Sequence, residues 1–200
     1  MKQIAAHKFW SPVRLWLVTD PSIDAELILD TALRLDASYG SAIGIWFRDK
    51  RPDPDLALAK RLLGSMQHAR FLAGSSAIGK AVGVTAVHEP TLLFPSTATA
   101  CSAPAHSETE AEAAVAAGAQ ALMVSPLFKR KYDNDEAGVS LVTRVRTVVP
   151  NTHLYALGGV TADNAASCAA AGANGVAVLS EVWESLSPVD AADAIVKALR

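Results

Sequence analysis

The stretch 154–180 constrains the fold of this chain more than any other, because it predicts a strand, a glycine turn, a helix and a second strand in direct succession. An apolar strand leads into Gly158-Gly159, and Thr161 is a good N-cap for an alanine-rich helix that ends at Gly172. A second apolar strand follows at once. This order is typical of a βαβ unit, whose two strands lie parallel in one sheet.

Both strands of this unit end in a turn that could bind an anion. Gly158 and Gly159 carry no side chains that would keep a ligand from their backbone, and the second strand stops at Leu179-Ser180. The C-terminal ends of parallel strands lie together, so backbone N–H groups of the two turns can converge on one phosphate. The alternative is that Gly158-Gly159 is only a tight turn. We predict that these four residues bind a phosphate monoester.

The same alternation of strands and helices runs through the whole chain. Residues 116–125 and 170–179 repeat one pattern of helix end, Gly-Ala turn and buried strand. The segment 89–96 is short and bounded by prolines, which predicts a reduced helix after the fourth strand. The expected strands are 13–19, 41–47, 70–73, 84–88, 97–103, 121–125, 154–157 and 175–179; the expected helices are 25–35, 55–67, 107–117, 139–148, 161–172 and 189–200, with a short segment at 75–82 and a polar loop at 129–136.

Eight such units would each take about 25 of the 200 residues, enough for a short strand, a helix and two loops. We therefore predict an α/β protein with one domain, residues 1–200, folded as a single (β/α)8 TIM barrel with a reduced fourth helix. An open doubly wound sheet shows the same alternation. It would carry a glycine-rich turn after its first strand, where this chain has Thr19-Asp20-Pro21.

Composition excludes several classes of function. Half of the residues are hydrophobic and 19% are charged, as expected of a soluble globular protein. The net charge of −2 predicts no binding to nucleic acid or to an anionic membrane, and no apolar run is long enough to span a bilayer. Cys101 and Cys168 lie in no CxxC or Cys/His pattern, so we expect two buried thiols, no zinc site and a cytoplasmic location.

In a (β/α)8 barrel the ligand site is built from residues that follow the strands. Arg48 and Lys50 alternate at the end of the second expected strand and suit an anionic substrate, although a solvated charge pair is the alternative. His106 is the best-placed general acid or base, because imidazole titrates near neutral pH; a structural role at a helix start is the alternative. His88 and Ser125 are expected to bind substrate at the same end.

Several short segments together indicate a family. They are LWLVTD at 15–20, RDK at 48–50, AVH at 86–88, AHS at 105–107, SPLF at 125–128, ALGGVTADN at 156–164 and GANGVAVLS at 172–180. These segments resemble the thiamin phosphate synthase and TenI family. The resemblance implies a barrel that joins a pyrimidine diphosphate to a thiazole phosphate, or, in the TenI branch, isomerises the thiazole phosphate with a histidine at the position of His106. It also implies that the product phosphate lies on Gly158, Gly159 and the Leu179-Ser180 turn.

The chain departs from the synthase pattern where that pattern binds magnesium. Gly74-Ser75-Ser76 and Glu89-Pro90-Thr91 stand where aspartates are expected. Loss of two carboxylate ligands should remove the magnesium and most of the coupling chemistry, since departing pyrophosphate needs its charge neutralised. Glu89 is a candidate substitute for one ligand. Trp46 replaces a glutamine, and the run Lys129-Arg130-Lys131-Tyr132 replaces a Thr-x-Ser/Thr-Lys segment.

The leading hypothesis is a divergent TenI-like member that binds thiazole phosphate or thiamin phosphate, with His106 as the proton shuttle of a thiazole tautomerase. One alternative is an active thiamin phosphate synthase; another is a catalytically silent sensor or partner protein that keeps the phosphate turn only for binding. We expect no metal ligands and no certain cofactor, with magnesium only if synthase activity is retained. The expected partner is the small phosphorylated ligand, and the sequence is compatible with a homodimer.

Overall fold

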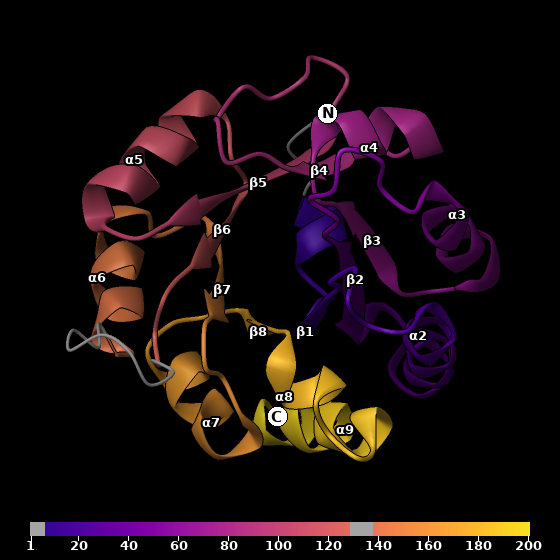
Figure 1. The fold of residues 1–200 in the computed structure, drawn as a ribbon. Helices are drawn as coiled ribbons and strands as arrows, with labels where there is room; N and C mark the ends of the chain where they lie inside the picture. Colours follow the sequence, from indigo (N-terminus) through magenta and orange to yellow (C-terminus); the bar gives the residue numbers. More distant parts are fainter. Residues whose placement is uncertain (1–6, 129–137) are drawn as a thin grey trace.

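Eight parallel strands close into a barrel, and helices surround it (Figure 1). The computed structural model describes residues 7–128 and 138–200. Each strand pairs with the next along the chain, and the last pairs with the first. The strands are β1 (Leu15–Val18), β2 (Ile43–Phe47), β3 (Arg70–Ala73), β4 (Ala86–His88), β5 (Ala100–Ala105), β6 (Ala121–Val124), β7 (His153–Leu157) and β8 (Gly175–Val178). The predicted (β/α)8 barrel is confirmed, and the open sheet is excluded.

Helices follow most strands, and their labels here are those of Figure 1. They are α2 (Ala25–Tyr39), α3 (Leu56–Ser65), α4 (Ser76–Val82), α5 (Glu108–Ala117), α6 (Ser140–Val148), α7 (Ala162–Ala170), α8 (Ser180–Trp183) and α9 (Pro188–Ala198), with a 3-10 turn at Gly40–Ala42. Local sequence sets most of their starts. The side chains of Asp24, Asp55, Ser75 and Ser107 cap α2, α3, α4 and α5 by accepting hydrogen bonds from backbone N–H groups in the first turn.

Alternate residues of each strand face the barrel interior or the surrounding helices, which gives two apolar layers. Every residue of β1, β2 and β6 is buried, which explains why these strands read as continuous apolar runs. The outer layer, between barrel and helices, includes Leu15, Leu17, Ile43, Ile45, Phe71, Leu122 and Val176. The inner layer includes Trp16, Val18, Trp46, Leu72, Met123, Tyr155 and Ala177.

Aromatic side chains close the end of the barrel where the strands begin. Trp10 and Trp16 pack edge to face with ring centroids 5.6 Å apart, and the Tyr155 hydroxyl donates to the Trp10 carbonyl at 2.8 Å. Gly44 makes this possible, since a Cβ there would lie 2.3 Å from the Trp16 ring. The filled interior leaves ligand chemistry to the opposite end, where the strands finish.

The segment after β4 and the bounds of β5 can be compared with the sequence-based predictions. No helix follows β4 in residues 89–99, which confirms the reduced fourth helix. The expected strand 97–103 was misplaced, because β5 spans Ala100–Ala105. Pro104 lacks a backbone N–H, yet the strand continues through it, in register with Met123 of β6. This shift brings the end of β5 directly to His106.

The cysteines, the apolar length of the helices and the loop at 129–136 were also the subject of predictions. Cys101 and Cys168 are both buried, as expected. Within residues 7–128 and 138–200, no helix has the length and apolar character needed to cross a bilayer. The expected polar loop at 129–136, which contains Lys129-Arg130-Lys131, lies outside the described residues.

Candidate functional site

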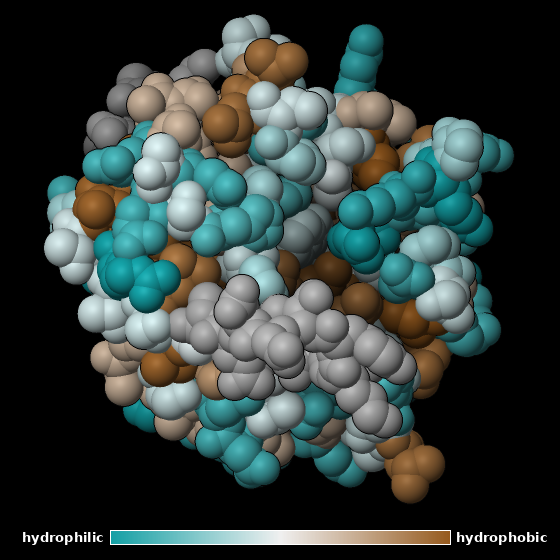
Figure 2. All heavy atoms as spheres, turned by 60° about the vertical axis from the view of Figure 1, so that its left-hand side comes forward, coloured by the Kyte–Doolittle hydropathy of each residue, from teal (hydrophilic) through white to brown (hydrophobic). Residues whose placement is uncertain are grey.

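The candidate site lies at the C-terminal ends of the strands, which we call the mouth. The turned view in Figure 2 shows a hollow near the middle of the molecule, with hydrophobic atoms at its floor and hydrophilic groups on its rim. All the candidate residues predicted from the sequence follow or end a strand at this same end of the barrel. The closed topology therefore brings them to one face, although they come from six different strands.

Trp46 of β2 and His88 of β4 pack against each other inside the barrel. Their ring centroids are 4.4 Å apart, and each residue is only 5% exposed. The His88 Nδ1 lies 3.0 Å from the hydroxyl oxygen of Ser102, which is fully buried on β5. Burial lowers the pKa of His88 to about 3, and the positive charges of Arg48 and Lys50 add to this effect. His88 is therefore neutral at physiological pH.

Arg48 and Lys50 lie on the rim, but not for the reason that the sequence suggested. The strand β2 ends at Phe47, so the alternation of strand side chains does not extend to them. Arg48 is part-buried and forms an ion pair with Asp20, with Nη1 and Oδ2 3.2 Å apart. Both cations lower the pKa of His88, which places their charges close to the mouth. Two basic side chains thus act on His88 from this part of the rim, and one of them is paired with Asp20.

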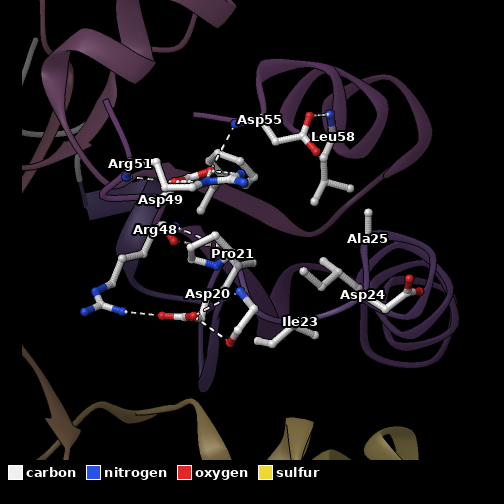
Figure 3. A pocket seen from close by; sticks show the side chains of 14 residues that line it. Asp20, Pro21, Ile23, Asp24, Ala25, Arg48, Asp49, Arg51, Asp55 and Leu58 are labelled. Atoms are coloured by element: carbon white, nitrogen blue, oxygen red, sulfur yellow. Dashed lines mark hydrogen bonds and ion pairs between the residues drawn. The ribbon is translucent and has the colours of Figure 1, made fainter. Parts of the chain in front are cut away.

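A polar cavity of about 470 Å³ opens between the ends of β1 and β2 and the helices α2 and α3 (Figure 3). Asp49 dominates its wall: the carboxylate accepts hydrogen bonds from the Arg51 side chain, from the Arg51 backbone N–H and from the Asp55 N–H. The Arg51 hydrogen bond is the main cause that lowers the pKa of Asp49 to about 2. Sequence reasoning missed this arrangement, although an Asp-x-Arg spacing in a short loop could have indicated it.

His106 and Ser125 are brought together on the opposite side of the mouth. The His106 Nδ1 lies 2.6 Å from the Ser125 carbonyl oxygen, and the backbone N–H of His106 donates to Glu110. Because a carbonyl oxygen only accepts, Nδ1 must carry the proton when the ring is neutral. The Nε2 lone pair is then available as a base. The ring is exposed, so a ligand at the mouth can reach it.

The Gly158-Gly159 turn lies against the loop that follows β6. Both glycines have positive φ, 99° and 71°, which favours glycine over other residues. The backbone N–H of Phe128 donates to the Gly158 carbonyl at 2.8 Å, and a Cβ on Gly159 would lie 2.0 Å from the Phe128 oxygen. Sequence reasoning attributed these glycines to the approach of a ligand. Their close contact with the neighbouring loop requires them even without one.

Leu179 and Ser180 follow β8, which neighbours β7, so their turn lies next to the Gly158-Gly159 turn at the mouth. Ser180 also begins the short helix α8, which the sequence did not reveal. Both residues line a cavity of about 340 Å³ that carries the carboxylates of Asp20, Asp24 and Glu184. On that side the surroundings are acidic, so a phosphate would have to bind on the side of Gly158.

The carboxylates of the mouth do not fit a magnesium site. Asp20 is bound to Ser22 and Arg48, and Asp49 to Arg51 and Asp55. Glu89, the candidate substitute ligand, is buried, and its carboxylate accepts from the backbone N–H of Ser76 at 2.5 Å. Among residues 7–128 and 138–200, no three His, Cys, Asp or Glu side chains gather in a metal-binding cluster. We therefore derive no step through a metal.

Comparison with known proteins finds similarity to one family over part of the chain. The sequence pattern of the family described as thiamine monophosphate synthase matches residues 98–182. This segment of the chain is therefore similar to the thiamine monophosphate synthase and TenI family. The thiamine-phosphate synthase of Geobacillus kaustophilus is 41% identical over 87 residues, which are 42% of this chain and 39% of that protein. That of Bacillus velezensis is 35% identical over 91 residues, 44% of this chain and 41% of that protein.

The chain thus spans about two fifths of the length of the curated relatives that it matches. Solved structures agree with the fold over nearly the whole chain. The thiamine phosphate pyrophosphorylase from Pyrococcus furiosus has a TM-score of 0.77 at 20% identity and covers 94% of this chain and 96% of its own. A 3-hexulose-6-phosphate synthase has a TM-score of 0.74 at 15% identity, with 94% and 100% covered.

The family match covers only one half of the barrel. Residues 98–182 contain β5 to β8, and therefore His106, Ser125 and both turns of the predicted phosphate site. Arg48, Lys50 and His88 lie outside the matched segment. The departures from the synthase pattern at residues 46, 74–76 and 89–91 also lie outside it, whereas the departure at 129–132 lies inside it. The half that carries His106 and the glycine turn is thus the half that resembles the family.

Proposed function

We propose that this chain binds a phosphorylated thiazole at the mouth and shifts a proton on its ring, as a thiazole tautomerase. His106 acts as the proton shuttle. The phosphate lies on the Gly158-Gly159 and Leu179-Ser180 turns, and Ser125 contacts the substrate between the two. The positive charges of Arg48 and Lys50 favour an anionic ligand at this end of the barrel.

The orientation of His106 carries this proposal. The hydrogen bond from Nδ1 to the Ser125 carbonyl holds the ring in one tautomer, with Nε2 as the basic atom. Glu110 supports the same position by accepting from the His106 backbone N–H at 2.9 Å. A base held in one orientation at an open mouth is what removal and return of a ring proton require.

The carboxylates argue against the coupling reaction. Coupling would release pyrophosphate, and its charge needs a cation bound by free carboxylates. Asp20, Asp49 and Glu89 are instead occupied by hydrogen bonds within the chain. The relatives are named as synthases, so the coupling reaction remains the alternative function. A magnesium-dependent assay with pyrimidine diphosphate and thiazole phosphate distinguishes coupling from tautomerisation.

The test is the substitution His106→Asn, which keeps a hydrogen-bonding side chain but removes the titrating group. Thiazole-phosphate isomerisation, followed by NMR of the substrate, should fall by about 10²- to 10⁴-fold with unchanged binding of thiazole phosphate. His68→Asn, at an exposed histidine after α3, is the matched control and should not change the rate. Equal rates in wild type and His106→Asn would return His106 to a structural role. Binding with no turnover of either reaction would favour the sensor.

A further inference from the structure

Ser102 is a polar residue in a position where the barrel is otherwise apolar. It lies on β5 in register with His88 of β4, and its side chain is fully buried. Ala100, its neighbour on the same face of the strand, belongs to the apolar inner layer. The hydroxyl oxygen has one hydrogen-bond partner among the described side chains, the His88 Nδ1 at 3.0 Å. A buried hydroxyl in this position needs a reason, because burial of an unpaired polar group is costly.

The direction of this hydrogen bond follows from the surroundings. A buried O–H that donates to nothing costs more than an unused acceptor, so the Ser102 hydroxyl donates and Nδ1 accepts. The neutral ring of His88 then carries its proton on Nε2. The Trp46 ring packs against the His88 ring at a tilt of 48°, with centroids 4.4 Å apart, and restricts its rotation. Arg48 and Lys50 carry positive charges that act on the ring, and both disfavour a second proton.

We propose that Ser102 is a positioning residue, which holds His88 in the Nε2–H tautomer so that this N–H donates to the uncharged ring of the ligand. The inference rests on the proposed function and extends it to the recognition of the thiazole. His88 and His106 would then stand at one mouth in opposite tautomers. His88 offers a hydrogen-bond donor, and His106 offers a base.

The first experiment reads the tautomer directly, from the ring ¹⁵N chemical shifts of histidine-labelled protein at neutral pH. Wild type should show His88 as Nε2–H and His106 as Nδ1–H. Ser102→Ala should convert the His88 signal to a mixture of both tautomers, and Ser102→Thr, which keeps the hydroxyl, should restore one. His106 should not change in either variant, which reports that the mouth is still folded. A wild-type His88 protonated on Nδ1, or a tautomer unchanged in Ser102→Ala, would overturn the proposal.

The second experiment separates ring recognition from phosphate binding by titration calorimetry. Ser102→Ala and His88→Phe should each weaken binding of thiazole phosphate about 5- to 10-fold, the effect of one hydrogen bond. Affinity for inorganic phosphate should stay unchanged in both variants. Equal weakening for both ligands, or none for either, would contradict a role in ring recognition. If wild type binds neither ligand, the proposed function fails, while the ¹⁵N spectra still decide whether Ser102 sets the tautomer.

Discussion

At the scale of single residues, Gly159 shows how one position can serve packing and binding at once. A side chain there would meet the backbone of Phe128, and φ is positive as well. Substitution therefore disturbs the loop after β6 before any ligand arrives. A loss of phosphate binding in a Gly159 variant would not by itself locate the phosphate.

We expect Gly159→Val to lower the free energy of unfolding by about 2 to 6 kcal/mol. This figure is the sum of two costs, the strained backbone at positive φ and the overpacking of the new side chain against Phe128. Urea denaturation measures this change. Gly64→Val is a useful control, because no atom lies within 4 Å of a Cβ built at Gly64. Wild-type stability in Gly159→Val would mean that the loop after β6 gives way easily, and the glycine would then have to be explained by a ligand.

Asp49 is a second residue whose role is structural and can be measured by pH. Its side chain is 3% exposed and holds Arg51 and the first turn of α3. Its pKa is lowered to about 2 from the ordinary value of 3.8. Because the pKa of Asp49 is lower in the folded state than in the unfolded state, its ionised carboxylate stabilises the fold at pH values above about 4. This contribution disappears as the pH falls from about 4 to about 2.

We expect Asp49→Asn to lower the free energy of unfolding by about 1 to 2 kcal/mol at pH 6. The loss is no larger because the Arg51 side chain is exposed, and solvent screens its attraction to Asp49. The difference from wild type should shrink towards zero near pH 2, as shown by denaturation curves across this range. Asp53→Asn, in the same loop but exposed, should cost much less. A difference that stays constant with pH would exclude the charge as its cause.

At the scale of elements, the two turns after β7 and β8 are among the parts of the mouth that the family match covers. The helix α7 begins with a capping box, in which Asn164 accepts from the Thr161 N–H. That N–H is therefore not available to a ligand. We therefore expect an anion to approach this region at the backbone of Gly159 and at the start of α8.

Ser180 allows a test of this region without the strain that a glycine substitution causes. Ser180→Glu places a negative charge at the first residue of α8, where a helix tolerates a carboxylate, but where it repels a phosphate. Ser180→Gln has the same size without the charge and is its matched control. Thiazole phosphate should stabilise the Gln variant nearly as well as wild type, and the Glu variant much less. Equal stabilisation of both variants would place the anion elsewhere.

At the scale of the whole molecule, this stabilisation appears as a shift in melting temperature. A ligand that binds only the folded state, at about 100 times its Kd, adds roughly 2.7 kcal/mol. For a domain of this size the shift is roughly 5 to 10 °C. The unphosphorylated thiazole alcohol should shift melting much less, because it lacks the anion. A calorimetric scan in which alcohol and phosphate act equally would argue against a phosphate site.

The architecture of this barrel was predictable from the amino-acid sequence alone. Alternating apolar runs and helix-period segments reflect local backbone geometry, so eight units and their order could be derived from them. The capping residue Thr161 indicated the start of a helix for the same local reason, and the structure has a capping box there. The place of His106 at the end of a strand was predictable too, because every parallel strand ends at the same mouth.

Which side chains meet at the mouth depends on tertiary contacts that the sequence pattern does not reveal. Trp46, His88 and Ser102 are far apart in the chain, and their contact depends on the register of three strands around the closed barrel. The reach of Phe128 to Gly159 depends likewise on the path of a loop between two strands. Periodicity predicts which face a residue occupies. Its partner on that face is set by register and loop conformation, which arise only when the whole barrel closes.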